Sequence, residues 1–215
     1  MIKAIVFDFD GTLANTIFSV REGVNAAMRA FDFPEHDVAA VTSFINTGAR
    51  ELLRKALPAD RQRDEELLDR VMEVYDAAYA EVCCENVPLY DGMGELLLSL
   101  KKSFKIGVLS NKQDHFVKRL CSEILPKGCC DAALGALPDK PTKPDPYLPN
   151  RIAEMLGVKP EECLMIGDSD VDFRTAQNAG MAHIGVSWGY RDESFLRDHG
   201  VTRIAHSASE LKDMI

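Results

Sequence analysis

The sequence predicts an α/β protein, a doubly wound parallel sheet with a helical insertion close to the N-terminus. Residues 2–7 form a mostly apolar run that ends at Asp8 and a turn at Gly11, which is typical of a buried parallel strand. Residues 15–88 contain almost no strand signal and place apolar side chains at helical spacing. From residue 91 onward, apolar strands alternate with helical segments, as they do in doubly wound sheets.

The elements after the insertion follow the βα alternation closely. We expect strands at residues 105–111, 132–136, 163–166, 182–186 and 202–205, and helices at residues 92–102, 147–156, 192–199 and from 207, with further helices after the first of these strands and before Gly180. Strands joined by helices run parallel, so their C-terminal ends meet at one edge of the sheet. Open α/β sheets bind ligands at that edge.

The insertion is predicted from two amphipathic stretches. Their apolar side chains recur every three or four residues, at Val20, Val24, Ala27 and Phe31, and again at Leu67, Val71, Val74 and Ala78. A turn at residues 88–92 then returns the chain to the sheet. We therefore predict a main domain of residues 1–14 and 89–215, with residues 15–88 as the inserted helical domain.

Composition limits the classes of function. The 215 residues are 46% hydrophobic and 27% charged, which suits a globular protein with one core and a smaller inserted unit. A net charge of −9 and the lack of a basic stripe argue against nucleic acid binding. A small anionic substrate stays compatible with this charge, because a bound divalent cation and one lysine can reverse the potential inside a cleft.

The chain also lacks the patterns of secreted and membrane proteins. Its first residues predict a strand and not a signal peptide, and no apolar segment approaches the roughly 20 residues of a spanning helix. The six cysteines include no CxxC spacing, which favours reduced structural thiols over zinc or redox chemistry. We therefore expect a cytoplasmic protein that does not bind membranes. For the oligomeric state, which these patterns do not address, we expect a monomer or weak dimer.

Polar side chains follow several of the predicted strands. They are Asp8 and Asp10, Ser110 and Asn111, and Asp168 with Asp172, and the loop residue Lys143 is placed to reach the same edge. Any one of them alone could be a helix cap or a turn residue. Capping does not require acids, an amide and a lysine together, however, and this combination suits a divalent metal and a phosphoryl group.

Four segments that contain these residues resemble the motifs of the haloacid dehalogenase superfamily, and they occur in the family order. They are Asp8-Phe9-Asp10-Gly11-Thr12-Leu13, Leu109-Ser110-Asn111, Lys143-Pro144-Asp145-Pro146 and Gly167-Asp168-Ser169-Asp170-Val171-Asp172. The resemblance covers nearly the whole chain and implies a Rossmann-like core, with the helical insertion as a small cap domain. Residues 186–190 resemble a segment common in the phosphoglycolate phosphatase-like branch.

The resemblance implies a role for each acidic residue. Asp8 would be the nucleophile, and a carboxylate suits this task because it is ionised at neutral pH without a partner base. Asp10 would be the general acid and base, and its backbone carbonyl would help to hold the metal. Asp8 and Asp168 would be the carboxylate ligands of Mg²⁺, and Asp172 would orient metal-bound water.

The remaining motif residues would bind the phosphoryl group. Ser110 and Asn111 would donate hydrogen bonds to its oxygens, and Lys143 would neutralise charge on Asp8 and on the phosphoryl group. Lys140 competes for this last role but lacks the proline that lies two residues beyond Pro144 in the lysine motif. In the cap, Arg50 is a candidate for substrate specificity, although an arginine at the start of an amphipathic helix is usually solvated.

The leading hypothesis is a Mg²⁺-dependent phosphatase for a small phosphorylated metabolite, with phosphoglycolate as the first named substrate. Asp10 argues against a dehalogenase, which the resemblance implies would lack the second acid. A sugar-phosphate mutase is the enzymatic alternative, but residues 17–20 contain no histidine of the kind such mutases have there. A phosphonatase would need a cap lysine, and Lys55 is expected to face solvent. A non-catalytic binding or regulatory protein is the alternative from another class.

Overall fold

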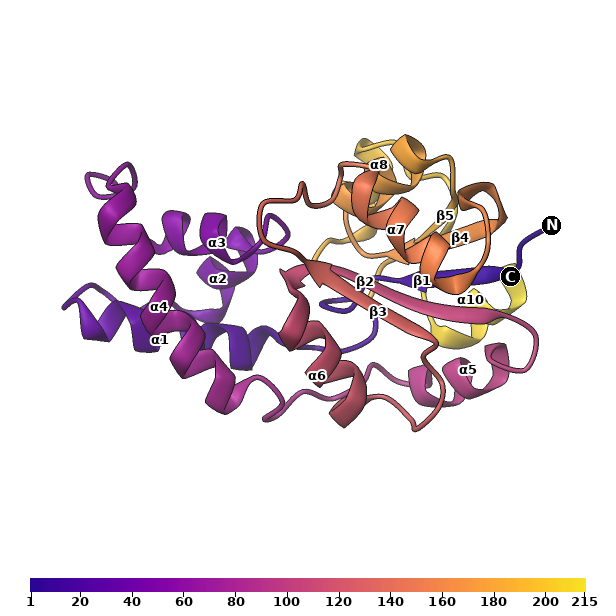
Figure 1. The fold of residues 1–215 in the computed structure, drawn as a ribbon, viewed down its shortest axis with the longest axis horizontal. Coiled ribbons are helices and arrows are strands. Elements are labelled where there is room, and N and C mark those ends of the chain that lie inside the picture. Colours follow the sequence, from indigo (N-terminus) through magenta and orange to yellow (C-terminus); the bar gives the residue numbers. More distant parts are fainter. The chain divides into compact units, whose positions relative to one another are not determined.

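Six parallel strands form one sheet in the order β3-β2-β1-β4-β5-β6, in a computed structural model that describes residues 1–215 (Figure 1). The strands are β1 (Ala4–Phe7), β2 (Lys105–Gln113), β3 (Ala132–Ala136), β4 (Cys163–Gly167), β5 (Ala182–Val186) and β6 (Ile204–Ala205). The chain builds outward from β1 on one side through β2 and β3, then on the other side through β4, β5 and β6. The predicted α/β fold is confirmed, and its strand order reverses beside β1, where such sheets bind ligands.

Helices cover both faces of this sheet. They are α5 (Met93–Leu100), α6 (Asp114–Ile124), α7 (Tyr147–Leu156), α8 (Asp170–Ala179), α9 (Glu193–Asp198) and α10 (Ala208–Met214), with a short 3₁₀ turn at Pro160–Glu162. Figure 1 shows α7 and α8 on one face, and α5, α6 and α10 on the other. Alternate residues of β1 follow this division: Ala4 and Val6 belong to the core cluster with Leu148 and Ile152 of α7.

The chain divides into two compact units. One comprises Met1–Asn15 and Pro88–Ile215 and contains the sheet, and the other is Thr16–Val87. Each boundary lies one residue from the position predicted from the sequence. The second unit is helical, with α1 (Ile17–Ala30), α2 (Val38–Phe44), α3 (Ala49–Ala56) and α4 (Glu65–Val82).

Within the helical unit, α1 and α4 pack along their apolar sides. Val24 and Ala27 of α1 and Val71 of α4 are fully buried, as their helical spacing predicts. Phe31, Val74 and Ala78 are only partly buried, and Leu68, which was not among the predicted positions, is fully buried. Asp64 caps the N-terminus of α4, since its side chain accepts a hydrogen bond from the backbone N–H of Leu67. None of the helices in the protein combines the length and the apolar composition that crossing a bilayer requires.

Strand β2 is longer than its predicted bounds. It extends two residues beyond the expected end at Asn111, because Gln113 pairs with Ala136 of β3 after a shift in register. Helix α6 follows without a loop at Asp114. The extension places Lys112 on the strand, close to the edge where the candidate site lies.

Candidate active site

Three buried carboxylates meet at the C-terminal edge of the sheet. Asp8 directly follows β1, Asp168 follows β4, and Asp172 lies in the first turn of α8. One oxygen from each of the three lies within 4.8 Å of the others. The backbone N–H of Asp8 donates to the carbonyl of Ile166 at 2.9 Å, which joins the end of β1 to β4. The structure thus brings together the three acids that the sequence placed at strand ends.

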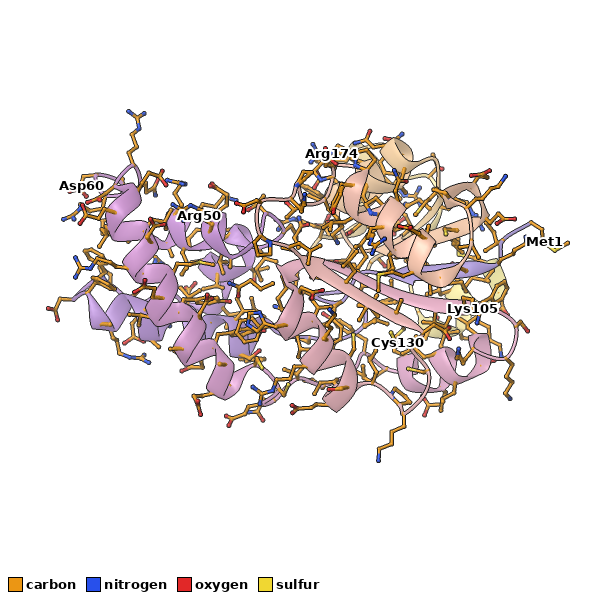
Figure 2. All side chains as sticks on the ribbon, viewed as in Figure 1. Met1, Arg50, Asp60, Lys105, Cys130 and Arg174 are labelled. Atoms are coloured by element: carbon orange, nitrogen blue, oxygen red, sulfur yellow. The ribbon has the colours of Figure 1, made fainter.

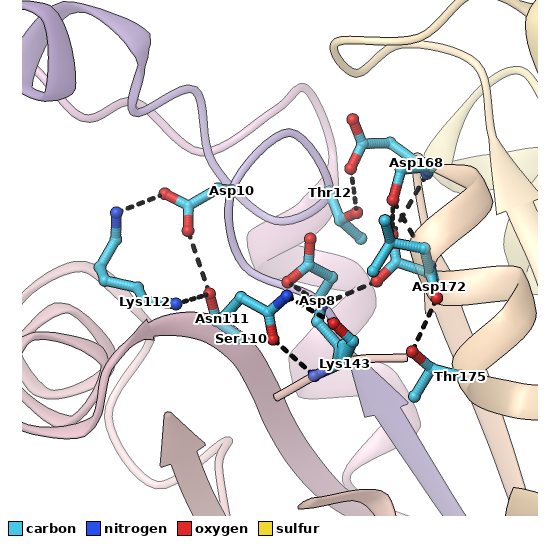
Figure 3. A network of polar contacts seen from close by, with 12 residues as sticks. Asp8, Asp10, Thr12, Ser110, Asn111, Lys112, Lys143, Asp168, Asp172 and Thr175 are labelled. Atoms are coloured by element: carbon cyan, nitrogen blue, oxygen red, sulfur yellow. Dashed lines mark hydrogen bonds and ion pairs between the residues drawn. The ribbon is translucent and has the colours of Figure 1, made fainter. Parts of the chain in front are cut away.

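Lys143 is the cation at the centre of this cluster (Figure 3). Its Nζ lies 2.8 Å from Oδ1 of Asp8 and 2.7 Å from Oδ1 of Asp172, and its side chain is only 3% exposed. The loop that contains Lys143 is held by Asn111 of β2. The Asn111 amide donates to the Lys143 carbonyl at 3.0 Å and accepts from the Lys143 N–H at 2.8 Å.

Asp168 is held by groups from two other segments. Its Oδ1 accepts a hydrogen bond from the Thr12 hydroxyl at 3.2 Å, and its Oδ2 accepts one from the Tyr190 backbone N–H at 2.8 Å. Two glycines allow this close packing. A Cβ on Gly189 would lie 2.4 Å from the Asp168 Cβ, and one on Gly11 would lie 2.4 Å from an Asp168 carboxylate oxygen. Only glycine therefore fits at either position without displacing the acid.

Asp172 has two tasks at the start of α8. Its Oδ2 accepts hydrogen bonds from the Ser169 hydroxyl at 2.6 Å and the Ser169 backbone N–H at 3.2 Å, as in a capping box. Its Oδ1 binds the Lys143 ammonium. The N-terminus of the helix favours a negative charge at this position, so the capping interaction also fixes a carboxylate beside the lysine.

Asp10 turns away from the other acids and is held by β2 instead. Its Oδ2 accepts a hydrogen bond from the Ser110 hydroxyl at 3.2 Å, and its Oδ1 lies 2.9 Å from the Lys112 ammonium. The Lys112 backbone N–H donates to the same Ser110 oxygen at 3.1 Å. In Figure 3, Asp10 and Lys112 lie on one side of Asp8, and Asp168 and Asp172 lie on the other.

Burial changes the protonation equilibria of the cluster. It raises the pKa of Asp8 well above the ordinary value, and although Lys143 lowers it, Asp172 and Asp168 add to the rise. It raises the pKa of Asp168 to about 7, with Asp172 adding to the effect against the hydrogen bonds from Tyr190 and Thr12. Burial works against the charge of Lys143, but the carboxylates of Asp172 and Asp8 outweigh it and raise the pKa of the ammonium.

The donor set fits a hard divalent cation. Asp8, Asp168 and Asp172 offer only carboxylate oxygens, with no thiolate or imidazole among them, and all three are buried. Burial, with repulsion from the neighbouring acids, raises the pKa values of Asp8 and Asp168, and a bound divalent cation would offset both effects. Carboxylate oxygens are the ligands that hard divalent cations prefer, so these residues could hold such an ion.

The sequence-based candidates differ in how the structure places them. Asp8, Asp168, Asp172 and Lys143 form one cluster, and Ser110 contacts Asp10. The Asn111 side chain contacts the Lys143 backbone through both its nitrogen and its oxygen, so it holds the loop that contains Lys143. Arg50, labelled in Figure 2, lies on α3 in the helical unit and pairs with Glu65 and Asp69 of α4.

Four polar groups at the site are absent from the sequence-based list of candidates. The Thr12 hydroxyl, the Ser169 hydroxyl and the Tyr190 N–H hold Asp168 or Asp172, and the Lys112 ammonium binds Asp10. Thr12 and Ser169 lie inside the family motifs, so the sequence could have identified them as residues of the site. The sequence did not identify Lys112, because the strand at residues 105–111 was expected to end before it.

Comparisons with known proteins find related sequences and structures over most of the chain. Residues 2–180 match the sequence profile of haloacid dehalogenase-like hydrolases. A phosphoglycolate phosphatase from Vibrio parahaemolyticus is 30% identical over 221 residues, which cover 100% of this chain and 96% of that protein. A solved structure of a candidate phosphoglycolate phosphatase from Lactobacillus delbrueckii subsp. bulgaricus superimposes with a TM-score of 0.90 at 30% identity, covering 99% and 98% of the two chains. A predicted phosphatase from Clostridium acetobutylicum superimposes with a TM-score of 0.86 at 25% identity, covering 100% and 98%.

Proposed function

The chain belongs to the haloacid dehalogenase-like hydrolases, and from this premise we propose that it is a Mg²⁺-dependent phosphatase acting on a small phosphorylated metabolite. The substrate we propose first is 2-phosphoglycolate. The names of several similar proteins support this choice, including the phosphatase from Vibrio parahaemolyticus, which aligns with this chain over its full length.

The observation on which the proposal depends is the separation of the two aspartates of the first motif. Asp8 belongs to the cluster with Lys143, whereas Asp10 is held apart by Ser110 and Lys112. Displacement at phosphorus through a covalent intermediate needs a nucleophile and a separate acid and base. The two carboxylates have different partners and therefore different surroundings, which suits them to these two roles.

The chemistry follows in two displacements. In the first, Asp8 attacks phosphorus, the bond from phosphorus to the ester oxygen breaks, and Asp10 gives its proton to the departing alkoxide. In the second, Asp10 accepts a proton from water as the water attacks the aspartyl phosphate, which releases inorganic phosphate and restores Asp8.

The other residues of the cluster hold these groups in place and balance their charge. Lys143 supplies a positive charge beside Asp8 and the transferred phosphoryl group, and Asn111 fixes the backbone from which it extends. Mg²⁺, held by Asp8, Asp168 and the backbone carbonyl of Asp10, would neutralise charge on the phosphoryl oxygens. Asp172 fixes Lys143 and lies close to Asp8 and Asp168, so it would orient water bound to the ion.

The helical unit is proposed as the cap that excludes water and selects the substrate. Arg50 stays a candidate for specificity, and its ion pairs with Glu65 and Asp69 give it a competing structural task. The cytoplasmic location and the monomeric or weakly dimeric state also stay predictions.

The proposal is tested by phosphate release from 2-phosphoglycolate, sugar monophosphates, nucleotides and pyrophosphate, with Mg²⁺ and with a chelator. We expect turnover that the chelator abolishes, with 2-phosphoglycolate the best substrate. The absence of metal-dependent release from every compound would contradict a phosphatase and favour a binding protein. Isomerisation of a sugar monophosphate, activated by a sugar bisphosphate, would identify a mutase instead.

A variant of the nucleophile tests the mechanism. We expect Asp8→Asn to fold and to reduce kcat by about 10⁴-fold or more, because an amide does not form the aspartyl phosphate. Asp198→Asn, an exposed substitution of the same kind at the end of α9, is the matched control and should keep full activity. Substantial turnover by Asp8→Asn would reject Asp8 as the nucleophile.

A further inference from the structure

We propose that Lys112 recognises a carboxylate in the leaving group of the substrate and thereby selects phosphate esters of small hydroxy acids over neutral ones. The inference rests on the proposed function and adds a specificity-determining residue to it. The observation behind it is the ion pair between Lys112 and Asp10, the acid that faces the leaving group in the proposed reaction.

Lys112 is built into the site and is not a mobile surface lysine. Its side chain is 11% exposed, that of Asp10 is 12% exposed, and Nζ lies 2.9 Å from Oδ1 of Asp10. The backbone at Lys112 is fixed because it belongs to β2, and its N–H donates to the Ser110 hydroxyl, which in turn donates to Asp10. The ammonium of Lys112 therefore contacts Asp10 directly, and its main-chain N–H contacts the hydroxyl that holds Asp10.

The position of Lys112 matches the leaving-group side of the reaction. Asp8, Asp168 and Asp172 gather the groups that act on the phosphoryl moiety, and Asp10 lies on the opposite side of Asp8 with Lys112 beyond it (Figure 3). For Asp10 to protonate the ester oxygen, the leaving group must lie next to the Asp10 carboxylate. Substituents on that leaving group therefore come within reach of the Lys112 ammonium.

The geometry of a hydroxy-acid ester fits this arrangement. In 2-phosphoglycolate one methylene separates the ester oxygen from the carboxylate carbon, so the carboxylate oxygens lie about 3 Å from the ester oxygen. An ammonium has three N–H donors and can bind the Asp10 carboxylate and a substrate carboxylate together. A bond of this kind, made where water is largely excluded, is among the stronger hydrogen bonds in proteins.

The charges at the site also favour Lys112, rather than Lys143, as the residue that binds a substrate carboxylate. The four aspartates at positions 8, 10, 168 and 172 surround two lysines, and Lys143 already binds both Asp8 and Asp172. A substrate carboxylate adds a further negative charge on the Asp10 side. Lys112 contacts Asp10 on that side of the site, so its ammonium is placed to bind the substrate carboxylate.

A simpler role for Lys112 would be to hold Asp10 in position and nothing more. In that case its loss would slow the hydrolysis of every ester to the same extent, because all of them need Asp10. Recognition of a carboxylate instead predicts that the loss depends on the leaving group. The two roles are therefore separated by comparing substrates and not by activity alone.

The test compares 2-phosphoglycolate with ethyl phosphate, which has a similar two-carbon chain without the carboxylate. We measure kcat and KM with Mg²⁺ for the wild type and for Lys112→Met, Lys112→Gln and Lys112→Arg. Lys118→Met, on the exposed side of α6, is the matched control. Thermal unfolding of each variant shows whether it is folded, and the use of two neutral replacements keeps the test informative if one of them is not.

We expect the ratio of kcat/KM for 2-phosphoglycolate to that for ethyl phosphate to fall about 10- to 100-fold in the Met and Gln variants. Most of this selective loss should appear in KM. The Arg variant should recover most of the preference, and Lys118→Met should match the wild type. An equal loss for both esters would reduce Lys112 to a positioning residue and overturn the inference, as would an unchanged ratio or a wild type without preference for 2-phosphoglycolate. If the wild type hydrolysed neither ester in a metal-dependent way, the proposed function itself would fail.

Discussion

Lys143 and Asp8 form an ion pair 2.8 Å long in which each side chain is almost completely buried. The pKa of the Asp8 carboxyl nevertheless stays well above its ordinary range, because burial outweighs the effect of the lysine and Asp172 and Asp168 lie nearby. The pKa of Lys143 is raised as well, since Asp172 and Asp8 together outweigh its own burial. One ammonium is thus shared by two buried acids, Asp8 and Asp172, and a divalent cation bound to the cluster would compensate its remaining negative charge.

Removing the shared ammonium should destabilise the protein strongly. We expect Lys143→Met to reduce the free energy of unfolding by about 3–5 kcal/mol, because Asp8 and Asp172 are left buried without compensation. Urea denaturation at neutral pH measures this loss. The double variant Lys143→Met/Asp172→Asn should recover about 1 kcal/mol or more of it, since one uncompensated charge is gone. Losses that simply add in the double variant would show that Lys143 and Asp172 are not coupled.

Mg²⁺ should stabilise the folded protein through the acid cluster, independently of any turnover. At a concentration 100 times its Kd, a ligand that binds only the folded state adds about 2.7 kcal/mol to the free energy of unfolding. We expect Mg²⁺ to raise the Tm of the wild type and to leave that of Asp168→Asn unchanged. Asp170→Asn is the matched control, because Asp170 pairs with Arg174 and is not among the three clustered acids. An Mg²⁺-dependent rise in Asp168→Asn as large as that of the wild type would place the ion elsewhere.

A single methyl group at Gly189 should disturb the site. A Cβ there would lie 2.4 Å from both the Cβ of Asp168 and the carbonyl oxygen of Gly11. We expect Gly189→Ala to cost about 1–3 kcal/mol of stability and to weaken the effect of Mg²⁺ on Tm, because Asp168 has to move. Gly94→Ala is the control, since its added Cβ would make only ordinary contacts at 3.7 Å. A Gly189→Ala protein with wild-type stability and wild-type response to Mg²⁺ would contradict the close packing described here.

His183 on β5 should make stability depend on pH. Its Nε2 is shielded from solvent without a hydrogen-bond partner, and burial lowers its pKa from 6.5 to about 4, against an opposing effect of Asp172. Between these two values the unfolded chain binds the proton and the folded protein does not. The stability linked to His183 is therefore complete above pH 6.5 and is lost as the pH falls toward 4.

Urea denaturation at pH 7 and pH 5 measures this dependence. We expect the loss of unfolding free energy between the two values to be smaller in His183→Leu than in the wild type, by about 2 kcal/mol. The exposed His199 provides the control, and His199→Leu should keep the pH dependence of the wild type. Equal losses in His183→Leu and the wild type would show that this histidine is not the source.

The sequence by itself determined the fold class and the edge of the sheet at which the acidic residues meet. Apolar strands at fixed intervals specify a parallel sheet, and the C-terminal ends of such strands lie at one edge. Asp8 and Asp168 each follow a buried strand, so their meeting could be predicted without knowing any distance. Lys143 was predicted to join them because its motif resembles that of a known family, and its ammonium does contact Asp8.

The tertiary structure alone decided which partner each polar group has. The Asn111 side chain binds the backbone of Lys143, and Asp10 pairs with a lysine for which the sequence offered no signal. Such pairings depend on strand register and on where a strand ends, and β2 continues past its predicted end because Gln113 finds a partner in β3. Local patterns of hydrophobicity do not encode that long-range pairing, so the side chains that contact Asp8 and those that contact Asp10 become clear only when the strands are assembled.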